Sequence, residues 1–86
     1  MEALFSGAVQ GVGFRYTTVS IARGYDVTGY VRNLYDGRVQ LVAEGDPKEV
    51  RAFVNAVRRE MGPHIRDVTE NTQTATGEFV GFSVRR

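Results

Sequence analysis

The segment between Asp46 and Pro63 has clear start and stop signals for a helix, and it constrains the fold more than any other part of the chain. Asp46 can cap a helix, Pro47 suits the first helical position, and Glu49 can complete a reciprocal capping box. The apolar residues that follow share one helical face: Val50, Phe53, Val54, Val57 and Met61. Gly62-Pro63 predicts the end of the helix. Such an amphipathic helix must cover an apolar sheet or another helix.

Two segments of alternating apolar and polar residues precede this helix. The first contains Val27 and residues 29–33, and the second contains Val39, Leu41 and Ala43. Between them lies Tyr35-Asp36-Gly37, and an Asp-Gly pair in such a position predicts a β-hairpin.

The N-terminal part predicts a strand, a glycine turn and a second helix. Ala3 to Ser6 is a short apolar segment that stops at Gly7. After the turn, a helix is expected from about Phe14 to Tyr25, with Gly24 or Asp26 at its end. Its inward stripe is Phe14, Thr18, Ile21, Ala22 and Tyr25.

Residues 65–86 predict two more strands, with a turn at Thr76-Gly77 and a closing pattern of Phe79, Phe82 and Val84. The order is then strand, helix, strand, strand, helix, strand, with an extra pairing near the end. This order predicts an α+β fold, a ferredoxin-like α/β sandwich in which an antiparallel sheet of four to five strands carries two helices on one face. The fold alone does not define a function.

Composition limits the function classes. The 86 residues predict a single domain, residues 1–86, and 42% apolar with 24% charged residues is typical of a soluble globular chain. The absence of cysteine excludes disulfides, thiol nucleophiles and cysteine-based metal sites. A net charge of +1 predicts no general attraction to nucleic acid or to anionic membranes. With no signal or membrane segment in the sequence, we expect a cytoplasmic monomer that acts on a small molecule.

The run from Gly7 to Arg15 is the best candidate site. Gly7, Gly11 and Gly13 allow backbone N–H groups to converge, and Arg15 adds a planar cationic fork that matches two phosphate oxygens. The run lacks the Lys-Ser/Thr ending of a P-loop, so whole nucleotides are not expected. A tight strand-to-helix connection also uses glycines for geometry alone, and that reading stays open on the glycines by themselves.

Two motifs resemble the signatures of the acylphosphatase family. The first signature is matched in spacing by Gly7, Val9, Gln10, Gly11, Val12, Phe14 and Arg15. The second is matched by Gly29-Tyr30-Val31-Arg32-Asn33, followed by Gly37, Val39 and Gly45. The resemblance covers nearly the whole sequence.

The resemblance implies metal-independent hydrolysis of acyl phosphates to a carboxylate and inorganic phosphate, without a cofactor or a phosphoenzyme. It implies that Arg15 and Asn33 are catalytic: Arg15 holds the phosphoryl group and Asn33 positions the attacking water. The N–H groups that bind the substrate would come from Val9, Gln10, Gly11, Val12, Gly13 and Phe14. A departure lies at Ala8, where relatives often have a basic residue, and it puts substrate affinity in doubt.

Several alternatives stay open. Asparagine at the end of a strand is common for backbone reasons, so Asn33 has a structural reading as well. His64, beside Pro63, is expected in a surface loop. The main rival function is a non-catalytic ferredoxin-like module that binds an anion or RNA, although residues 38–44 offer no aromatic side chain on which a base could stack. A further possibility is a domain detached from a larger carbamoyl-transferring maturation protein. The compact chain of 86 residues favours a free-standing enzyme over this possibility.

Overall fold

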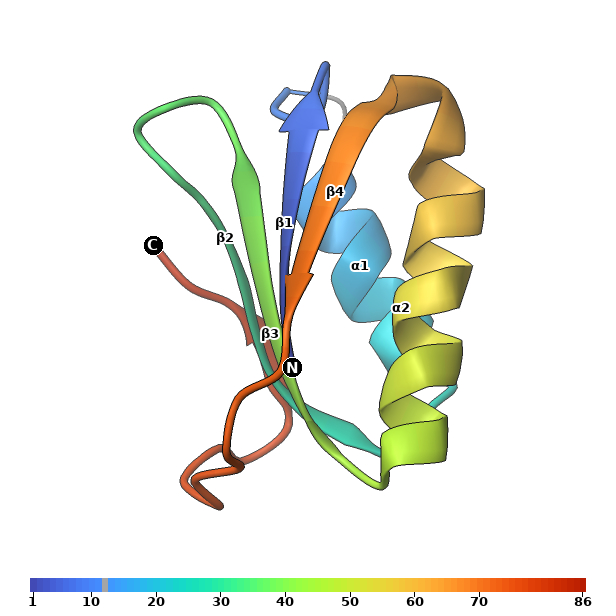
Figure 1. The fold of residues 1–86 in the computed structure, drawn as a ribbon, viewed down its shortest axis with the longest axis vertical. Helices are drawn as coiled ribbons and strands as arrows, with labels where there is room; N and C mark the ends of the chain where they lie inside the picture. The colour runs from blue at the N-terminus through green and yellow to red at the C-terminus, as the bar shows by residue number, and fades with distance from the viewer. Residues whose placement is uncertain (12) are drawn as a thin grey trace.

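The computed structural model describes residues 1–11 and 13–86, and its two helices lie on the same face of one sheet (Figure 1). A short 3-10 turn, Gly62–His64, follows the second helix. The elements in chain order are β1 (Glu2–Gly7), α1 (Phe14–Ala22), β2 (Val27–Asn33), β3 (Val39–Gly45), α2 (Pro47–Met61), β4 (Ile65–Asn71) and β5 (Phe82–Val84).

The sheet has the strand order β4-β1-β3-β2-β5, so the α+β class and the ferredoxin-like arrangement are confirmed. The pairs among β4, β1, β3 and β2 are antiparallel, but β5 pairs with β2 in parallel, with Gly29 opposite Phe82. An entirely antiparallel sheet was therefore the wrong expectation for the last strand. The reason is the path of residues 72–81, which cross the end of the sheet from the β4 edge to the β2 edge (Figure 1). After this crossing β5 runs in the same direction as β2.

Alternation along the strands builds the core. The inner face of the sheet contributes fully or nearly fully buried residues from three strands, and α2 covers them with Phe53, Val54 and Val57. The ring of Phe53 meets the ring of Phe82 edge-on, with the centroids 5.1 Å apart. The inner residues of the sheet are Ala3, Phe5, Val27, Val31, Val39, Leu41 and Ala43.

The start of α2 confirms one cap and corrects another. Asp46 Oδ1 accepts a hydrogen bond from the Lys48 N–H at 2.9 Å, as expected for a capping residue. Glu49 does not complete a capping box, because its Oε1 accepts from the N–H of Asp26 at 2.9 Å. Glu49 thus ties α2 to the connection between α1 and β2. It satisfies a backbone donor that lies 23 positions away.

Helix α1 is shorter than the sequence pattern predicts. It ends at Ala22, and the next three N–H groups, of Arg23, Gly24 and Tyr25, donate to carbonyls three residues earlier. These tight turns redirect the chain into β2. Neither helix of the described chain combines the length and the apolar character needed to cross a lipid bilayer.

Candidate active site

The topology brings the glycine turn and the end of β2 to the same end of the sheet. Both β1 and β2 pair antiparallel with β3, so they run in the same direction and deliver their C-terminal ends together (Figure 1). A cavity of about 220 Å³ lies there. Its lining residues are Val9, Gly11, Gly13, Phe14, Arg15, Tyr16 and Asn33.

Two buried side chains anchor the turn between β1 and α1. Val9 is completely buried and Phe14 nearly so, and the ring of Phe14 lies 5.1 Å from that of Phe5 in β1. Gly11 and Gly13, in contrast, are exposed. The side chains of Val9 and Phe14 therefore belong to the core, and these residues can offer a ligand only their backbone groups.

Gly11 and Gly13 adopt backbone conformations that favour glycine. Their φ angles are +83° and +73°, in the left-handed region. A Cβ built at either position would meet no described atom within 4 Å. Backbone conformation, and not crowding, therefore explains the glycines, and the outer side of the turn is open for a ligand.

The first turn of α1 is suited to an anion. Gly13 is the N-cap and offers no side-chain acceptor, and no acidic residue lies in the first turn. The first helical hydrogen bond runs from the Thr17 N–H to the Gly13 carbonyl at 3.0 Å. The N–H groups before Thr17 therefore have no intrahelical acceptor, and they add to the positive end of the helix dipole.

Arg15 lies in this first turn, half-buried, and lines the cavity. None of the ion pairs formed among residues 1–11 and 13–86 involves Arg15. A cation is unfavourable at the positive end of a helix unless an anion is shared there. The guanidinium of Arg15, together with the N–H groups at the start of α1, makes this end of the cavity strongly attractive to an anion.

Asn33 lies on the inner face of the sheet, in line with Val31. Its Oδ1 atom is buried and accepts no hydrogen bond from any residue in the described chain. Arg32 alternates to the other face, where its Nε donates to Gln40 Oε1 at 2.6 Å. A buried amide oxygen that has no partner among the described residues is available as an acceptor for a bound water molecule or ligand.

The cavity gathers six of the eight predicted site residues: Val9, Gly11, Gly13, Phe14, Arg15 and Asn33. Gln10 does not line it, because its side chain turns to the β2–β3 connection and donates to the carbonyls of Leu34 and Arg38. Val12 lies outside the described residues.

Sequence reasoning missed Tyr16, a residue that is 72% exposed and lines the cavity. Its position next to Arg15, off the apolar stripe of the helix, is the signal that could have identified it.

No carboxylate is among the residues described as lining the cavity. The nearby turn contains Asp36, whose pKa is lowered chiefly by the hydrogen bond from the Arg38 backbone N–H and also by the Arg38 side chain. The Nε of Arg38 lies 2.8 Å from Asp36 Oδ2. Asp36 is thus an ionised, internally paired turn residue. Within residues 1–11 and 13–86, no three His, Asp or Glu side chains are grouped so that they could hold a metal ion.

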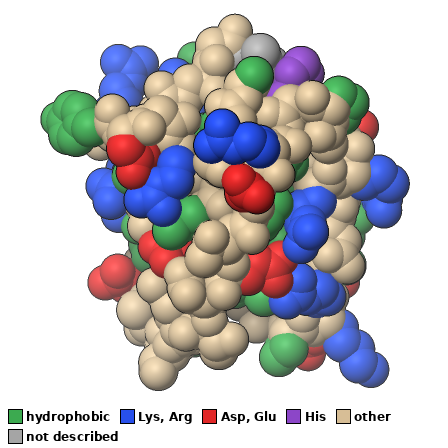
Figure 2. Space-filling view, turned by 45° about the horizontal axis from the view of Figure 1, so that its top comes forward, with side chains coloured by type: hydrophobic (Ala, Val, Ile, Leu, Met, Phe, Trp, Pro, Cys, Tyr) green, Lys and Arg blue, Asp and Glu red, His purple; other side chains and the backbone are tan. Residues whose placement is uncertain are grey.

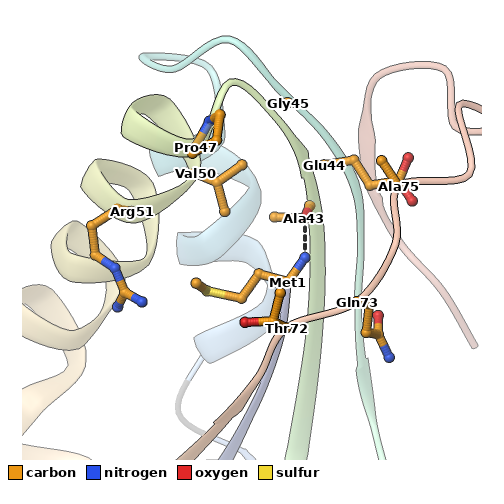
Figure 3. Close-up of a pocket in the computed structure, with 10 residues that line it drawn as sticks. All are labelled: Met1, Ala43, Glu44, Gly45, Pro47, Val50, Arg51, Thr72, Gln73 and Ala75. Atoms are coloured by element: carbon orange, nitrogen blue, oxygen red, sulfur yellow. Dashed lines mark hydrogen bonds between the residues drawn. The ribbon is translucent and has the colours of Figure 1, made fainter.

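A larger cavity, of about 400 Å³, lies at the opposite end of β3, between α2 and the loop of residues 72–81 (Figure 3). The amino group of Met1 donates to the Ala43 carbonyl at 2.8 Å beside it. Glu44 also lines it, and its carboxylate is held by the N–H groups of Thr76 and Gly77 at 2.9 and 3.0 Å. None of the predicted site residues lines this cavity.

The fold and the site together define a class: a ferredoxin-like α+β domain in which an open glycine turn, an arginine and a neutral amide line one cavity at one end of the sheet. Comparison with known proteins narrows this class. The family model described as Acylphosphatase matches residues 1–84, and the chain belongs to the acylphosphatase family.

Curated and solved relatives agree with this assignment. The chain is 44% identical over 89 residues to an acylphosphatase of Methylococcus capsulatus, covering all of this chain and 95% of that protein. The crystal structure of an acylphosphatase from Bacillus subtilis superimposes with a TM-score of 0.87 at 30% identity, over 99% of this chain and 96% of that one. The crystal structure of HypF from T. kodakarensis also matches, with a TM-score of 0.83 at 28% identity, but this covers only 11% of that chain. The same architecture therefore also occurs as a small part of a larger protein.

Proposed function

We propose that this chain hydrolyses acyl phosphates at the cavity between the glycine turn and Asn33. The observation that carries the proposal is the meeting of three features in one cavity: the open amide turn, the half-buried Arg15, and the unsatisfied Asn33 Oδ1. Family membership supports the same reaction class.

In this proposal the turn and Arg15 hold the phosphoryl group. The N–H groups at the start of α1, with those of Val9 to Gly13, bind the nonbridging oxygens, and the guanidinium of Arg15 binds two of them. Phosphoryl transfer needs mainly orientation and neutralisation of charge on these oxygens, and little covalent work from the protein. The cradle formed by the N–H groups of the glycine turn and by Arg15 provides both the orientation and the neutralisation of charge.

Asn33 positions the water. Its Oδ1 accepts a hydrogen bond from the water, so that an oxygen lone pair points at phosphorus. A carboxylate in the same place would repel the phosphoryl group, whereas an amide adds no charge. This role explains why an acceptor is buried beside the cavity without a partner in the described chain.

The chemical step balances without an added base. Water attacks phosphorus, and the bond between phosphorus and the acyl oxygen breaks with its electron pair on the leaving carboxylate. One proton of the water passes to a phosphoryl oxygen. An acyl phosphate dianion and water thus give a carboxylate and dihydrogen phosphate.

We further infer that residues 1–86 act as a single domain, as a cytoplasmic monomer without metal or cofactor, on small acyl phosphates. The rival reading as an RNA-binding module has little support from the outer face of the sheet. The only aromatic residue of β2 on this face, Tyr30, is covered by Arg85, whose guanidinium carbon lies 3.8 Å from the ring centroid, and by Phe79. In the view of Figure 2, acidic and basic side chains are interspersed instead of forming one basic tract.

The test is hydrolysis of acetyl phosphate and benzoyl phosphate, with and without a chelator, by the wild type and by Arg15→Ala, Arg15→Lys and Asn33→Ala. Loss of one preorganised donor typically costs about 10²–10³-fold in kcat. We expect Arg15→Ala to lose at least that much, and Arg15→Lys to recover little because lysine lacks the planar fork. Asn33→Ala should lower kcat while leaving competitive inhibition by inorganic phosphate nearly unchanged.

Arg23→Ala and Asn55→Ala are matched controls, since both residues are exposed and neither lines the cavity. They should keep wild-type kinetics. Binding of inorganic phosphate without any turnover would instead favour a non-catalytic anion-binding module. Full activity in a folded Arg15→Ala variant would refute the site, and loss of activity with the chelator would refute the metal-free mechanism.

A further inference from the structure

A single side chain joins the two halves of the candidate site. The Nε2 of Gln10, in the glycine turn, donates to the Leu34 carbonyl at 2.9 Å and to the Arg38 carbonyl at 3.0 Å. These acceptors lie 24 and 28 positions along the chain, in the connection between β2 and β3. Both N–H bonds of the amide are therefore used in holding this connection to the turn.

The two acceptors flank the last residue pair of the hairpin. Asn33 pairs with Val39 at the end of the β2–β3 ladder, Leu34 follows Asn33, and Arg38 precedes Val39. The Leu34 N–H also donates to the Arg38 carbonyl at 2.8 Å. Gln10 thus holds both ends of the β2–β3 connection, one residue beyond the Asn33–Val39 pair on each side.

The position of the Asn33 side chain depends on the position of its backbone. Asn33 Oδ1 accepts no hydrogen bond from the described residues, so no hydrogen bond through this atom fixes the side chain. The place of Oδ1 then depends on where the end of β2 lies relative to the glycine turn. The residues on either side of Gln10, Val9 and Gly11, line the cavity. A shift of Gln10 relative to Leu34 therefore changes the distance between the anion cradle and Asn33.

We propose that the Gln10 side chain is a positioning residue that sets the distance between the phosphoryl cradle and the Asn33 amide. This inference rests on the proposed function, in which Arg15 binds phosphate and Asn33 aims the water. It assigns to Gln10 a role through its side chain, distinct from any contact of its N–H with substrate.

The two acceptors define which side chains can do this work. Both are carbonyl oxygens, so two N–H donors on one atom are required. Methionine has a similar length and flexibility but no donor, and glutamate would place an anionic acceptor against two carbonyls. Gln10→Met therefore removes the bridge with little change in size. Gln10→Glu should separate the glycine turn from the β2–β3 connection more than Gln10→Met does, because the carboxylate is repelled by the two carbonyl oxygens.

The experiment measures kcat and KM for benzoyl phosphate, the inhibition constant of inorganic phosphate, and Tm for Gln10→Met, Gln10→Glu and a second neutral variant, Gln10→Ala. Gln73→Met is the control, because Gln73 is exposed and lies far from the site, beside the larger cavity. Misplacing a reacting group by about 1 Å can cost up to about 10²-fold in rate. We expect Gln10→Met and Gln10→Ala to lower kcat by about 10-fold or more. Inhibition by phosphate should change by less than about 2-fold, because Arg15 and the cradle remain.

A double-mutant cycle with Asn33→Ala identifies the route of the effect. If Gln10 acts through Asn33, Gln10→Met has almost no effect on kcat once Asn33 is alanine. An NMR spectrum provides a readout that does not depend on residual activity: the side-chain amide signals of Asn33 should move in Gln10→Met, while the Arg15 Nε signal of the phosphate complex should not.

Any of three results would overturn the inference. They are an unchanged kcat in Gln10→Met, a loss of kcat on Gln10→Met that is the same with Asn33 as with alanine at position 33, and Asn33 side-chain NMR signals that do not move. Failure of the proposed function has a different signature. In that case Asn33→Ala or Arg15→Ala itself keeps wild-type kinetics, whatever happens at Gln10.

Discussion

The substitution Gly13→Ala separates the two reasons for a glycine in the turn, chain geometry and room for substrate. Gly13 has φ +73°, and Gly77, in the loop between β4 and β5, has φ +70°. A Cβ at either position would meet no described atom within 4 Å. Alanine therefore imposes nearly the same strain at both positions, while only Gly13 lines the cavity with Arg15 and Asn33.

The expected loss of stability follows from the backbone. An L residue in the left-handed region costs about 1–2 kcal/mol. Alanine also reduces the entropy of the unfolded chain, which offsets roughly 0.4–1 kcal/mol. Each variant should thus lose about 1 kcal/mol of the free energy of unfolding. In a domain of this size this lowers Tm by about 4–8 °C.

The two variants should differ in catalysis. The methyl group of Gly13→Ala projects into open space beside the cavity, where the proposed phosphoryl oxygens approach the N–H groups of α1. If it displaces one oxygen from its donor, kcat/KM falls by about 10²-fold. Gly77→Ala should keep the wild-type kcat/KM, because Gly77 contributes only a backbone N–H, to Glu44, and alanine retains it.

Urea unfolding gives the two free energies, and hydrolysis of benzoyl phosphate well below both unfolding midpoints gives the two rates. Equal losses of stability with a rate defect confined to Gly13→Ala would support the cradle. A Gly13→Ala variant as active as the wild type would refute it. The same conclusion would follow if Gly77→Ala were equally impaired, since strain alone would then explain the loss.

Three further predictions concern the rest of the chain. The hydrogen bond from the Thr76 backbone N–H lowers the pKa of Glu44 below its unfolded value. The ionised carboxylate therefore stabilises the fold above the unfolded pKa, and this stability is lost as the pH falls through the folded pKa. Tm of Glu44→Gln should thus fall less on acidification than Tm of the wild type. Asp46→Ala removes the cap of α2 and should reduce the free energy of unfolding by about 1 kcal/mol in urea titrations, without changing kcat. Tyr16→Ala should raise KM for benzoyl phosphate more than KM for acetyl phosphate, since Tyr16 offers an exposed aromatic surface at the rim of the cavity; equal changes would contradict this contact.

Local signals made much of the fold predictable. Asp46 and Pro47 act within a few residues, so the start of α2 could be read directly from the sequence. The Asp36-Gly37 pair similarly predicted the hairpin between β2 and β3. The alternation of apolar and polar residues along β2 correctly predicted that Arg32 lies on the face opposite to Asn33.

The failures involve partners that lie far apart in the chain. Glu49 had a local partner available at the start of α2 but bonds instead to the N–H of Asp26, which only the packed fold brings near. The parallel pairing of β5 depends on the path of residues 72–81 across the end of the sheet. No signal in the sequence indicated that the Gln10 side chain reaches Leu34, 24 positions away, while the substrate-binding role of the Gln10 N–H stays a prediction. None of these choices is encoded in the spacing of neighbouring residues.

The geometry of the site depends on strand register as much as on residue type. Asn33 reaches the cavity because Val27, Val31 and Asn33 share one face of β2, and a slip of one residue against β3 would turn the amide to the outer face. The turn that fixes this register is held locally by Asp36, which accepts from the Arg38 N–H, and from outside by Gln10. No carboxylate is among the residues described as lining the cavity, so in the proposed mechanism we expect the rate to depend mainly on how accurately the hairpin places Asn33 relative to the glycine turn.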